Sequence, residues 1–164
     1  MGAVYSVTMQ NQTIIASADL VLIRTAAAIG TRASTIRILR AWCSQNATET
    51  SEQLGILLGL QASAFGTYTS TTPTPHMLGG AASGISGGTS GAAATAGTDA
   101  SANAAGTKTP VIYDGFNNLN GWLWVPTPEE RIIVPVDTAI VLAMVGTATA
   151  LGNWNAGITY EELN

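Results

Sequence analysis

The amino-acid sequence predicts an all-β protein, built as an antiparallel sandwich or barrel. Roughly eight short runs are rich in β-branched and aromatic residues, and Gly, Pro and Asn separate them. The runs do not alternate with helical patterns, so a parallel α/β sheet is not expected. No amphipathic pattern continues for about four helical turns. With 164 residues, the chain is long enough for one domain, residues 1–164, and short for two.

The first two strands are predicted at Val4–Met9 and Asp19–Thr25. Both lie in residues 3–63, where apolar and polar positions alternate. Asp19–Thr25 is apolar on both faces, so we expect it near the centre of a sheet.

The third predicted strand is Ser34–Ser44. Because side chains alternate along a strand, Trp42 is expected on the same face as Ile36 and Ile38. Cys43 falls on the opposite face, with no cation next to it in the sequence. A free cysteine in such a setting behaves as a small hydrophobic residue, and we expect it in the core.

A fourth strand is predicted at Glu52–Ser63, where Leu54, Ile56 and Leu58 share one face. A short helix over Ser51–Leu60 is the alternative. The strand is favoured because two interior glycines would each cost a helix about 1 kcal/mol relative to alanine.

The last part of the chain, residues 110–164, returns to strand-like patterning. Its predicted strands are Val111–Phe116, Gly121–Val125, Arg131–Val134, Asp137–Val145 and Ile158–Leu163. Proline and Asn-rich or Gly-rich turns separate them.

Residues 77–109 form a Gly/Ala/Ser/Thr-rich excursion from this pattern. Between Gly79 and Gly106 the only large apolar residue is Ile85 and the only charged one is Asp99. Such a composition buries too little apolar area to offset the entropy of ordering the segment alone. Two alternatives follow: a disordered excursion, or an extended arm that becomes ordered in an assembly.

The composition argues against several classes of function. The net charge is −4 and Lys108 is the only lysine, so a nucleic-acid partner is not expected. Cys43 and His76 are the only residues of their types, which excludes a disulfide framework and a Cys/His metal cluster. The longest apolar run, Ala139–Val145, is too short for a membrane span. We expect no metal, no cofactor and no membrane partner.

Few residues suggest catalysis. His76 follows a stiff Pro-Thr-Pro segment without a nucleophile elbow in the sequence, and it is expected as an exposed loop histidine. The pairs Glu129-Glu130 and Glu161-Glu162 have adjacent members, which point to opposite faces in a strand, so solvated or interface charges are expected. A carboxylate-dependent hydrolase would need Glu129 or Glu130 to converge with Asp114 or Asp137. The sequence therefore favours a protein that is not an enzyme.

Trp122 and Trp124 are two residues apart and share one face of a predicted strand. Facing inward they belong to the core, and facing outward they form an aromatic platform for a sugar or a protein. The inward orientation is favoured, because Pro126 follows as at the end of a sandwich strand.

A series of short landmarks runs along nearly the whole chain. They are Tyr5-Ser6-Val7, Asp19-Leu20, Ser44-Gln45, Thr71–Pro75, Phe116-Asn117 and Glu161-Glu162-Leu163. The longest is Gly121–Val134, GWLWVPTPEERIIV. In this order the landmarks resemble those of a family of small virion proteins of tailed phages and prophages. The chain departs from the family in its Gly/Ala-rich insert and in Asn153-Trp154-Asn155.

The resemblance implies a jelly-roll-like β-sandwich that acts as a capsid cement or decoration protein. Its implied partners are the major capsid protein and further copies of itself, as a homotrimer. It would be made in the host cytoplasm and located on the capsid exterior of the virion. The candidate interface residues are Gly79, Gly80, Ile85, Trp122, Trp124, Glu129, Glu130, Arg131 and Trp154.

The alternative function is a tail- or fibre-associated β-sandwich that binds carbohydrate on the host surface. Trp122, Trp124 or Trp154 would then provide the stacking platform.

Overall fold

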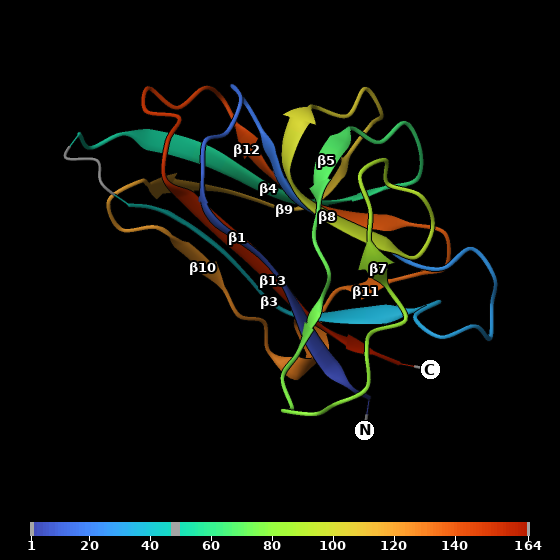
Figure 1. Cartoon of the computed structure of the whole chain (residues 1–164). Coiled ribbons are helices and arrows are strands. Elements are labelled where there is room, and N and C mark those ends of the chain that lie inside the picture. Colours follow the sequence, from blue (N-terminus) through green and yellow to red (C-terminus); the bar gives the residue numbers. More distant parts are fainter. Residues whose placement is uncertain (1, 47–49, 164) are drawn as a thin grey trace.

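The computed structural model describes residues 2–46 and 50–163. Two antiparallel sheets pack against each other, which confirms the predicted all-β sandwich (Figure 1). The strands are β1 (Val4–Gln12), β2 (Asp19–Arg24), β3 (Ile36–Gln45), β4 (Gln53–Gln61), β5 (Thr67–Ser70), β6 (Thr74–Pro75), β7 (Ser86–Gly87), β8 (Thr95–Ala102), β9 (Thr109–Asn117), β10 (Trp122–Trp124), β11 (Ile133–Val134), β12 (Ala139–Val145) and β13 (Trp154–Glu162). One 3-10 turn, Pro128–Glu130, lies between β10 and β11.

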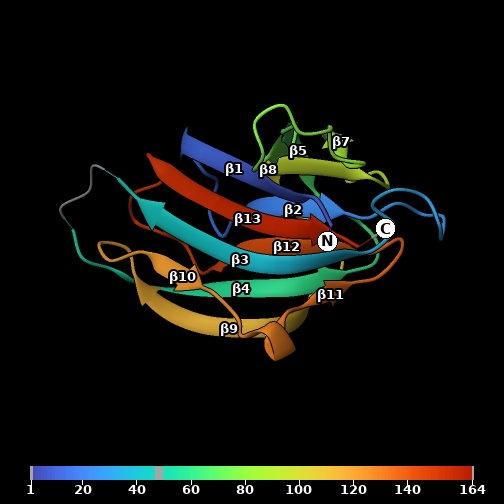
Figure 2. The ribbon, with the colours of Figure 1, turned by 90° about the horizontal axis from the view of Figure 1, so that it is seen from below.

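The strand order is that of a jelly roll. The first sheet runs β10-β3-β13-β1-β6, with β11 also on β3, and the second runs β5-β8-β2-β12-β4-β9, with β7 also on β8. The pairs are nested: β1 pairs with β13, β2 with β12, β3 with β10 and β4 with β9. Such nesting is what the double Greek key of a jelly roll produces. Figure 2 shows β9 at one margin of the sandwich and β5, β7 and β8 at the other.

The main core lies between the sheets, and a second, smaller cluster lies on the outer face of the second sheet. On β12, Ile140 and Leu142 face the main core, whereas Val141 faces the second cluster with Tyr68. Because both faces of the sheet are covered here, β2 is buried along nearly its whole length. This confirms the central position expected for Asp19–Thr25.

The sequence predicted Ile36, Ile38 and Trp42 on one face of β3. This prediction is wrong for the residues after Ile38. The pairing with β13 shifts register between Thr159 and Tyr160, which places an extra residue in β3. Such a bulge reverses the alternation, so Ala41 and Cys43 are buried and Trp42 is half-buried on the outer face. The expected burial of Cys43 is confirmed.

The prediction for β4 is confirmed. The segment is a strand rather than a helix, and Leu54, Ile56 and Leu58 are buried in the main core. In the last third of the chain each predicted strand is present, and β13 begins four residues before Ile158, at Trp154.

The Gly/Ala-rich segment is paired into the second sheet over part of its length, where the composition predicted no strand. Residues Thr95–Ala102 form β8, which pairs with β2 on one side and β5 on the other. Small side chains allow close packing here: a Cβ on Gly97 would lie 2.6 Å from the Cβ of Tyr68. The strand is stabilised by its neighbours rather than by large apolar side chains of its own.

Within the described residues, no helix is long and apolar enough to cross a bilayer.

Candidate interaction surfaces

Three of the predicted interface residues belong to the core. Ile85 is 1% exposed, Trp122 8% and Trp154 0%. Trp154 packs edge-on against Phe116, with ring centroids 6.4 Å apart, and its Nε1 donates a hydrogen bond to the Ala150 carbonyl. These three side chains are enclosed by the sandwich, so they do not present a surface to a partner.

The remaining predicted residues lie nearer the surface. Trp124 is half-buried against the main core, which agrees with the inward orientation favoured for both tryptophans of β10. Glu129 and Glu130 are exposed on the 3-10 turn, and Arg131 after them is half-buried.

Gly79 and Gly80 occupy a turn. The sequence did not indicate the two exposed residues that precede them, Met77 and Leu78. The Gly80 N–H donates a 2.9 Å hydrogen bond to the Met77 carbonyl, and Gly79 has a φ of 74°. A positive φ at the third position is typical of a type II turn, whose second residue lies at the tip. That residue is Leu78, whose side chain is fully exposed, and Met77 is 72% exposed.

A second turn has the same pattern. The Thr31 N–H donates to the Ala28 carbonyl at 3.4 Å, Gly30 has a φ of 82°, and Ile29 at the tip is 86% exposed. In both turns an aliphatic residue followed by glycine is the sequence signal that could have identified the tip.

These tips lie at one end of the sandwich where further apolar side chains are exposed, and we call it the apolar end. It consists of Ile29, Met77, Leu78, Ile133 and Leu163, each of them exposed. Contacts place all five at the same end: Ile133 pairs with Arg37 at the start of β3, and the Leu163 N–H bonds to Thr35 beside it. Arg32, in the loop that carries Ile29, binds Glu162 at the end of β13. His76 N–H bonds to Val4 at the start of β1, which pairs with the end of β13. Both chain termini lie at this end (Figure 1).

A pocket of about 430 Å³ opens next to Leu78. Its lining comes from the start of β1 and from the segment after β6: Gly2, Ala3, Val4, Tyr5, Pro75, His76, Met77, Gly80 and Ala81. Of these residues, Tyr5 and His76 alone have titratable side chains, so the pocket is suited to an apolar group.

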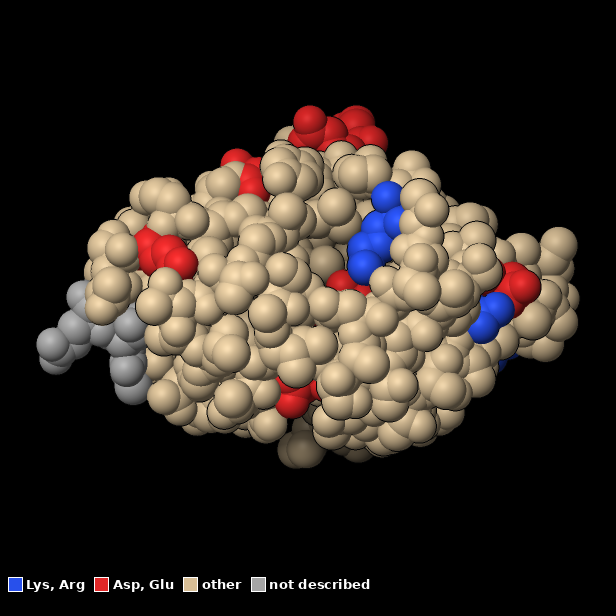
Figure 3. Space-filling model, turned by 90° about the horizontal axis from the view of Figure 1, so that it is seen from above, with Lys and Arg blue, Asp and Glu red and all other residues tan. Residues whose placement is uncertain are grey.

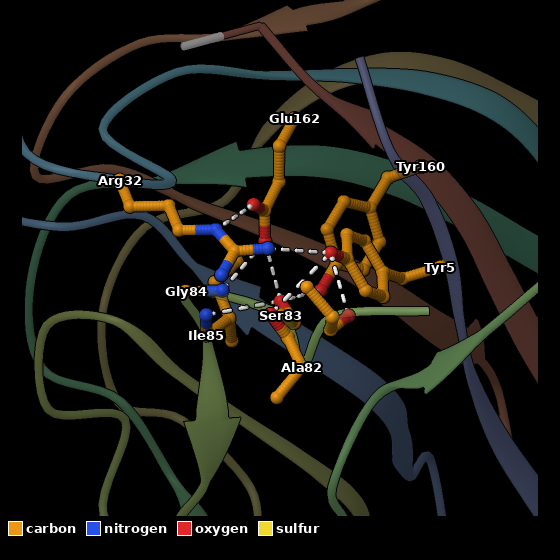
Figure 4. Close-up of polar contacts among 9 residues, drawn as sticks. Tyr5, Arg32, Ala82, Ser83, Gly84, Ile85, Tyr160 and Glu162 are labelled. Carbon is orange, nitrogen blue, oxygen red and sulfur yellow. Dashed lines mark hydrogen bonds and ion pairs between the residues drawn. The ribbon is translucent and has the colours of Figure 1, made fainter. Parts of the chain in front are cut away.

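A buried polar cluster holds Ser83 and Gly84, which follow the Met77–Gly80 turn (Figure 4). Glu162 on β13 accepts hydrogen bonds from Ser83 Oγ at 2.5 Å and from the Gly84 N–H at 2.8 Å. Arg32 donates to Glu162 at 3.1 Å and to the Tyr5 hydroxyl at 2.7 Å. The carboxylate is 2% exposed, so its charge is balanced inside the protein rather than by water.

Tyr160 completes this cluster. Its hydroxyl lies 2.7 Å from Ser83 Oγ, and its ring packs 5.7 Å from that of Tyr5. Burial raises the pKa of Tyr160, and the Glu162 charge raises it further, so the hydroxyl stays protonated. The prediction of solvated charges is therefore wrong for Glu161 and Glu162: both are buried, and Glu161 pairs with Arg37 at 2.8 Å.

A second buried ion pair holds the other end of the Gly/Ala-rich segment. Lys108 Nζ lies 3.0 Å from the Asp19 carboxylate, which also accepts hydrogen bonds from the Tyr68 hydroxyl and the Ala104 N–H, each at 3.2 Å. Burial raises the pKa of Tyr68, and the negative charge of Asp19 raises it further. An open pocket of about 370 Å³ borders this pair.

Charged groups are otherwise sparse. Figure 3 shows one face on which a few red and blue groups, some of them side by side, are surrounded by wide uncharged areas.

The candidate catalytic residues are placed as follows. His76 is exposed, and its Nε2 lies 2.7 Å from Ser6 Oγ, which in turn lies 2.9 Å from Thr159 Oγ1. In a hydrolytic triad the third residue binds the histidine and orients it. Here the third residue, Thr159, contacts the serine instead. The sequence did not single out Ser6, because strand pairing alone brings it to His76.

The carboxylates required by the hydrolase alternative have separate partners. Asp114 accepts a hydrogen bond from the indole N–H of Trp122 at 3.1 Å, and Asp137 pairs with Arg24 at 2.6 Å. Glu130 accepts a hydrogen bond from Thr127. Among the described residues no three His, Cys, Asp or Glu side chains are grouped as they would be to hold a metal ion.

Comparisons with protein-family models, with curated proteins and with solved structures found no match for this chain.

Proposed function

We propose that the chain is a structural, non-enzymatic virion protein that binds the major capsid protein on the outside of a phage head. In this proposal it is a cement or decoration protein and associates with further copies of itself. The jelly-roll order of its strands supports the proposal by analogy, because viral capsid domains often have this fold.

The apolar end is the observation that carries the proposal. Isolated exposed hydrophobic residues are common on proteins, but here five lie at one end of the sandwich, and an apolar pocket opens at the same end. The centres of protein–protein contacts are depleted of charged residues, and none of these five side chains is charged. A contact of this kind, repeated over a symmetric shell, would become strong through avidity.

The test is the copy number of the protein in purified particles, measured by quantitative mass spectrometry against the major shell subunit. A ratio near one, or a simple fraction of it, is expected for a decoration protein. Ile29→Asp and Ile133→Asp should each lower the ratio, because they place a charge in the contact. Leu119→Asp is the matched control, since Leu119 is 48% exposed in the turn between β9 and β10, away from the apolar end.

The outcomes are distinct. A few copies per particle would place the protein at the tail or at a vertex and contradict decoration of the shell. Absence from particles would contradict a virion role. Equal loss with Leu119→Asp would show that the effect does not come from the apolar end.

Carbohydrate binding is the second candidate function, and a different residue from those predicted supports it. Trp42 is half-exposed on the outer face of the first sheet, where its indole packs against Gly157. Leu123 pairs beside it and is 64% exposed. An aromatic ring backed by a strand is a suitable stacking platform for a sugar. Glycan-array binding that Trp42→Ala abolishes would support this function, and no binding to any glycan would contradict it.

A further inference from the structure

The Met77–Gly80 turn is a knob on the surface. Leu78 at its tip has no contact that shields it from water, since its exposed fraction is 104%. The turn is nevertheless held in place, because Gly80 bonds back to Met77 and Ser83 is fixed by Glu162 a few residues later. A fixed aliphatic tip can enter a partner without the entropy cost of ordering a loose loop.

The pocket beside this knob has the complementary character. Val4, Tyr5 and Pro75 contribute apolar parts of its lining, and Met77 and Gly80 from the turn itself also line it. Its volume of about 430 Å³ is ample for one aliphatic side chain together with part of the turn that carries it. Leu78 does not fill this pocket in its own chain, because the turn directs its side chain outward.

We propose that Leu78 of one copy occupies this pocket in a second copy of the chain. The knob and the pocket are neighbours on one surface, so two copies present both halves of the contact to each other. The Met77–Gly80 turn carries no charge, so its burial would leave no ion without a partner. The contact deepens the proposed function and rests on it for its biological role, namely self-association of the decoration protein.

Two symmetric arrangements use the same contact. If each copy gives and receives one knob within a pair, the result is a closed dimer. If each copy gives its knob to the next, the contacts close into a ring such as a trimer.

The experiment measures the mass of the purified chain in solution by light scattering and analytical ultracentrifugation over a series of concentrations. The wild-type chain is expected to form a defined oligomer. Leu78→Asp should reduce the mass to that of a single chain, 16.8 kDa. Ile29→Asp is the matched control, because Ile29 sits at the tip of an equivalent turn that does not border the pocket, and it should leave the oligomer unchanged.

A second variant blocks the pocket instead of the knob. Ala3 is exposed and lines the pocket, so Ala3→Trp should fill it and also give a single chain. Circular dichroism establishes that each variant is folded. In a mixture the intact knob of Ala3→Trp can still enter the open pocket of Leu78→Asp. A head-to-tail arrangement should then give a 1:1 dimer, whereas a reciprocal pair keeps one of its two contacts and should associate more weakly than the wild-type chain.

A wild-type chain that stays monomeric at every concentration would overturn the inference, as would an oligomer that survives Leu78→Asp. An oligomer that survives Ala3→Trp would overturn it as well. The proposed virion role is tested separately: if Ile29→Asp lowers particle occupancy while self-association fails in wild type, only the present inference is lost. If self-association follows this pattern and the chain is absent from particles, only the virion role is lost.

Discussion

The carboxylate of Glu162 accepts a hydrogen bond of 2.8 Å from the backbone N–H of Gly84, 78 residues earlier in the chain. This contact joins the last strand of the sandwich to the segment that the sequence predicted to be an excursion. Ser83 and Arg32 bind the same carboxylate. A buried charge in β13 therefore holds the segment that follows the Leu78 turn.

Glu162→Gln should loosen residues 83–85 without unfolding the sandwich. A hydrogen bond to a charged group contributes about 1.5–3 kcal/mol, so the amide of Gly84 should exchange with solvent roughly ten to a hundred times faster. Hydrogen exchange followed by mass spectrometry measures this change. Glu161→Gln is the control, because Glu161 pairs with Arg37 instead, and it should leave the Gly84 amide unchanged.

Gly157→Ala should destabilise the protein by displacing Trp42. A Cβ at this position would lie 2.7 Å from atoms of the Trp42 indole, closer than packing allows. Overpacking of this kind costs about 1–3 kcal/mol. Urea denaturation measures the loss, and the tryptophan emission should change in the folded state. Gly115→Ala is the control in another strand, since its nearest atom would be 3.9 Å away; an equal loss there would contradict the explanation.

The alternation of residues was sufficient to predict most strands and their buried faces, as β2 and β4 demonstrate. It did not predict the bulge in β3, because a bulge is a property of the pairing with β13 and leaves no mark in the composition of β3. The strand β8 was missed for a related reason. Alanine, glycine and serine carry little strand preference of their own, and β8 is held by β2, β5 and the ring of Tyr68.

The surface was predicted less well than the core. Tryptophans were selected as interface residues because large aromatic side chains are common in interfaces, but the same property places Trp154 in the core. The exposed tips Ile29 and Leu78 depend on turn geometry. In the sequence, the only sign of these tips is the glycine directly after each of them, which is the third residue of the turn.

Asp19→Asn should lower the free energy of unfolding by about 3 kcal/mol, since removal of one partner from a buried ion pair leaves Lys108 without its counter-charge. Asp19 is 1% exposed and also accepts hydrogen bonds from Tyr68 and Ala104. Urea unfolding provides the measurement.

Asp137→Asn is the control for the loss of stability expected from Asp19→Asn. Asp137 pairs with Arg24, but its side chain is 51% exposed, and an exposed pair contributes at most about 1 kcal/mol. Asparagine also tolerates the positive φ of this residue. Equal losses at the two positions would contradict the role of burial.

Cys43 should make the protein less stable at alkaline pH. Burial raises the pKa of its thiol from 9.0 to about 12. Between these values the unfolded chain loses the proton and the folded chain retains it, so stability falls as the pH rises above 9. The slope contributed by this thiol approaches about 1.4 kcal/mol per pH unit.

Urea unfolding between about pH 8 and pH 10 measures this slope. Cys43→Ala lowers the stability at every pH but should flatten its decline over this range, because the thiol no longer titrates. An unchanged slope in the variant would assign the decline to other groups.

The antiparallel pairing of β1 with β13 determines how the molecule responds to force. Val4 lies opposite Glu161, so the outer ends of both strands meet at one end of the sandwich. Tension applied through the two chain ends would open this pair like a zipper, one residue pair after another, beginning at Val4. Tension between the start of β1 and the β12–β13 connection at the far end would instead act along β1 and β13 and load their hydrogen bonds at once. A chain that is anchored at its apolar end through β1 and pulled from the opposite end would therefore resist the force along its strands.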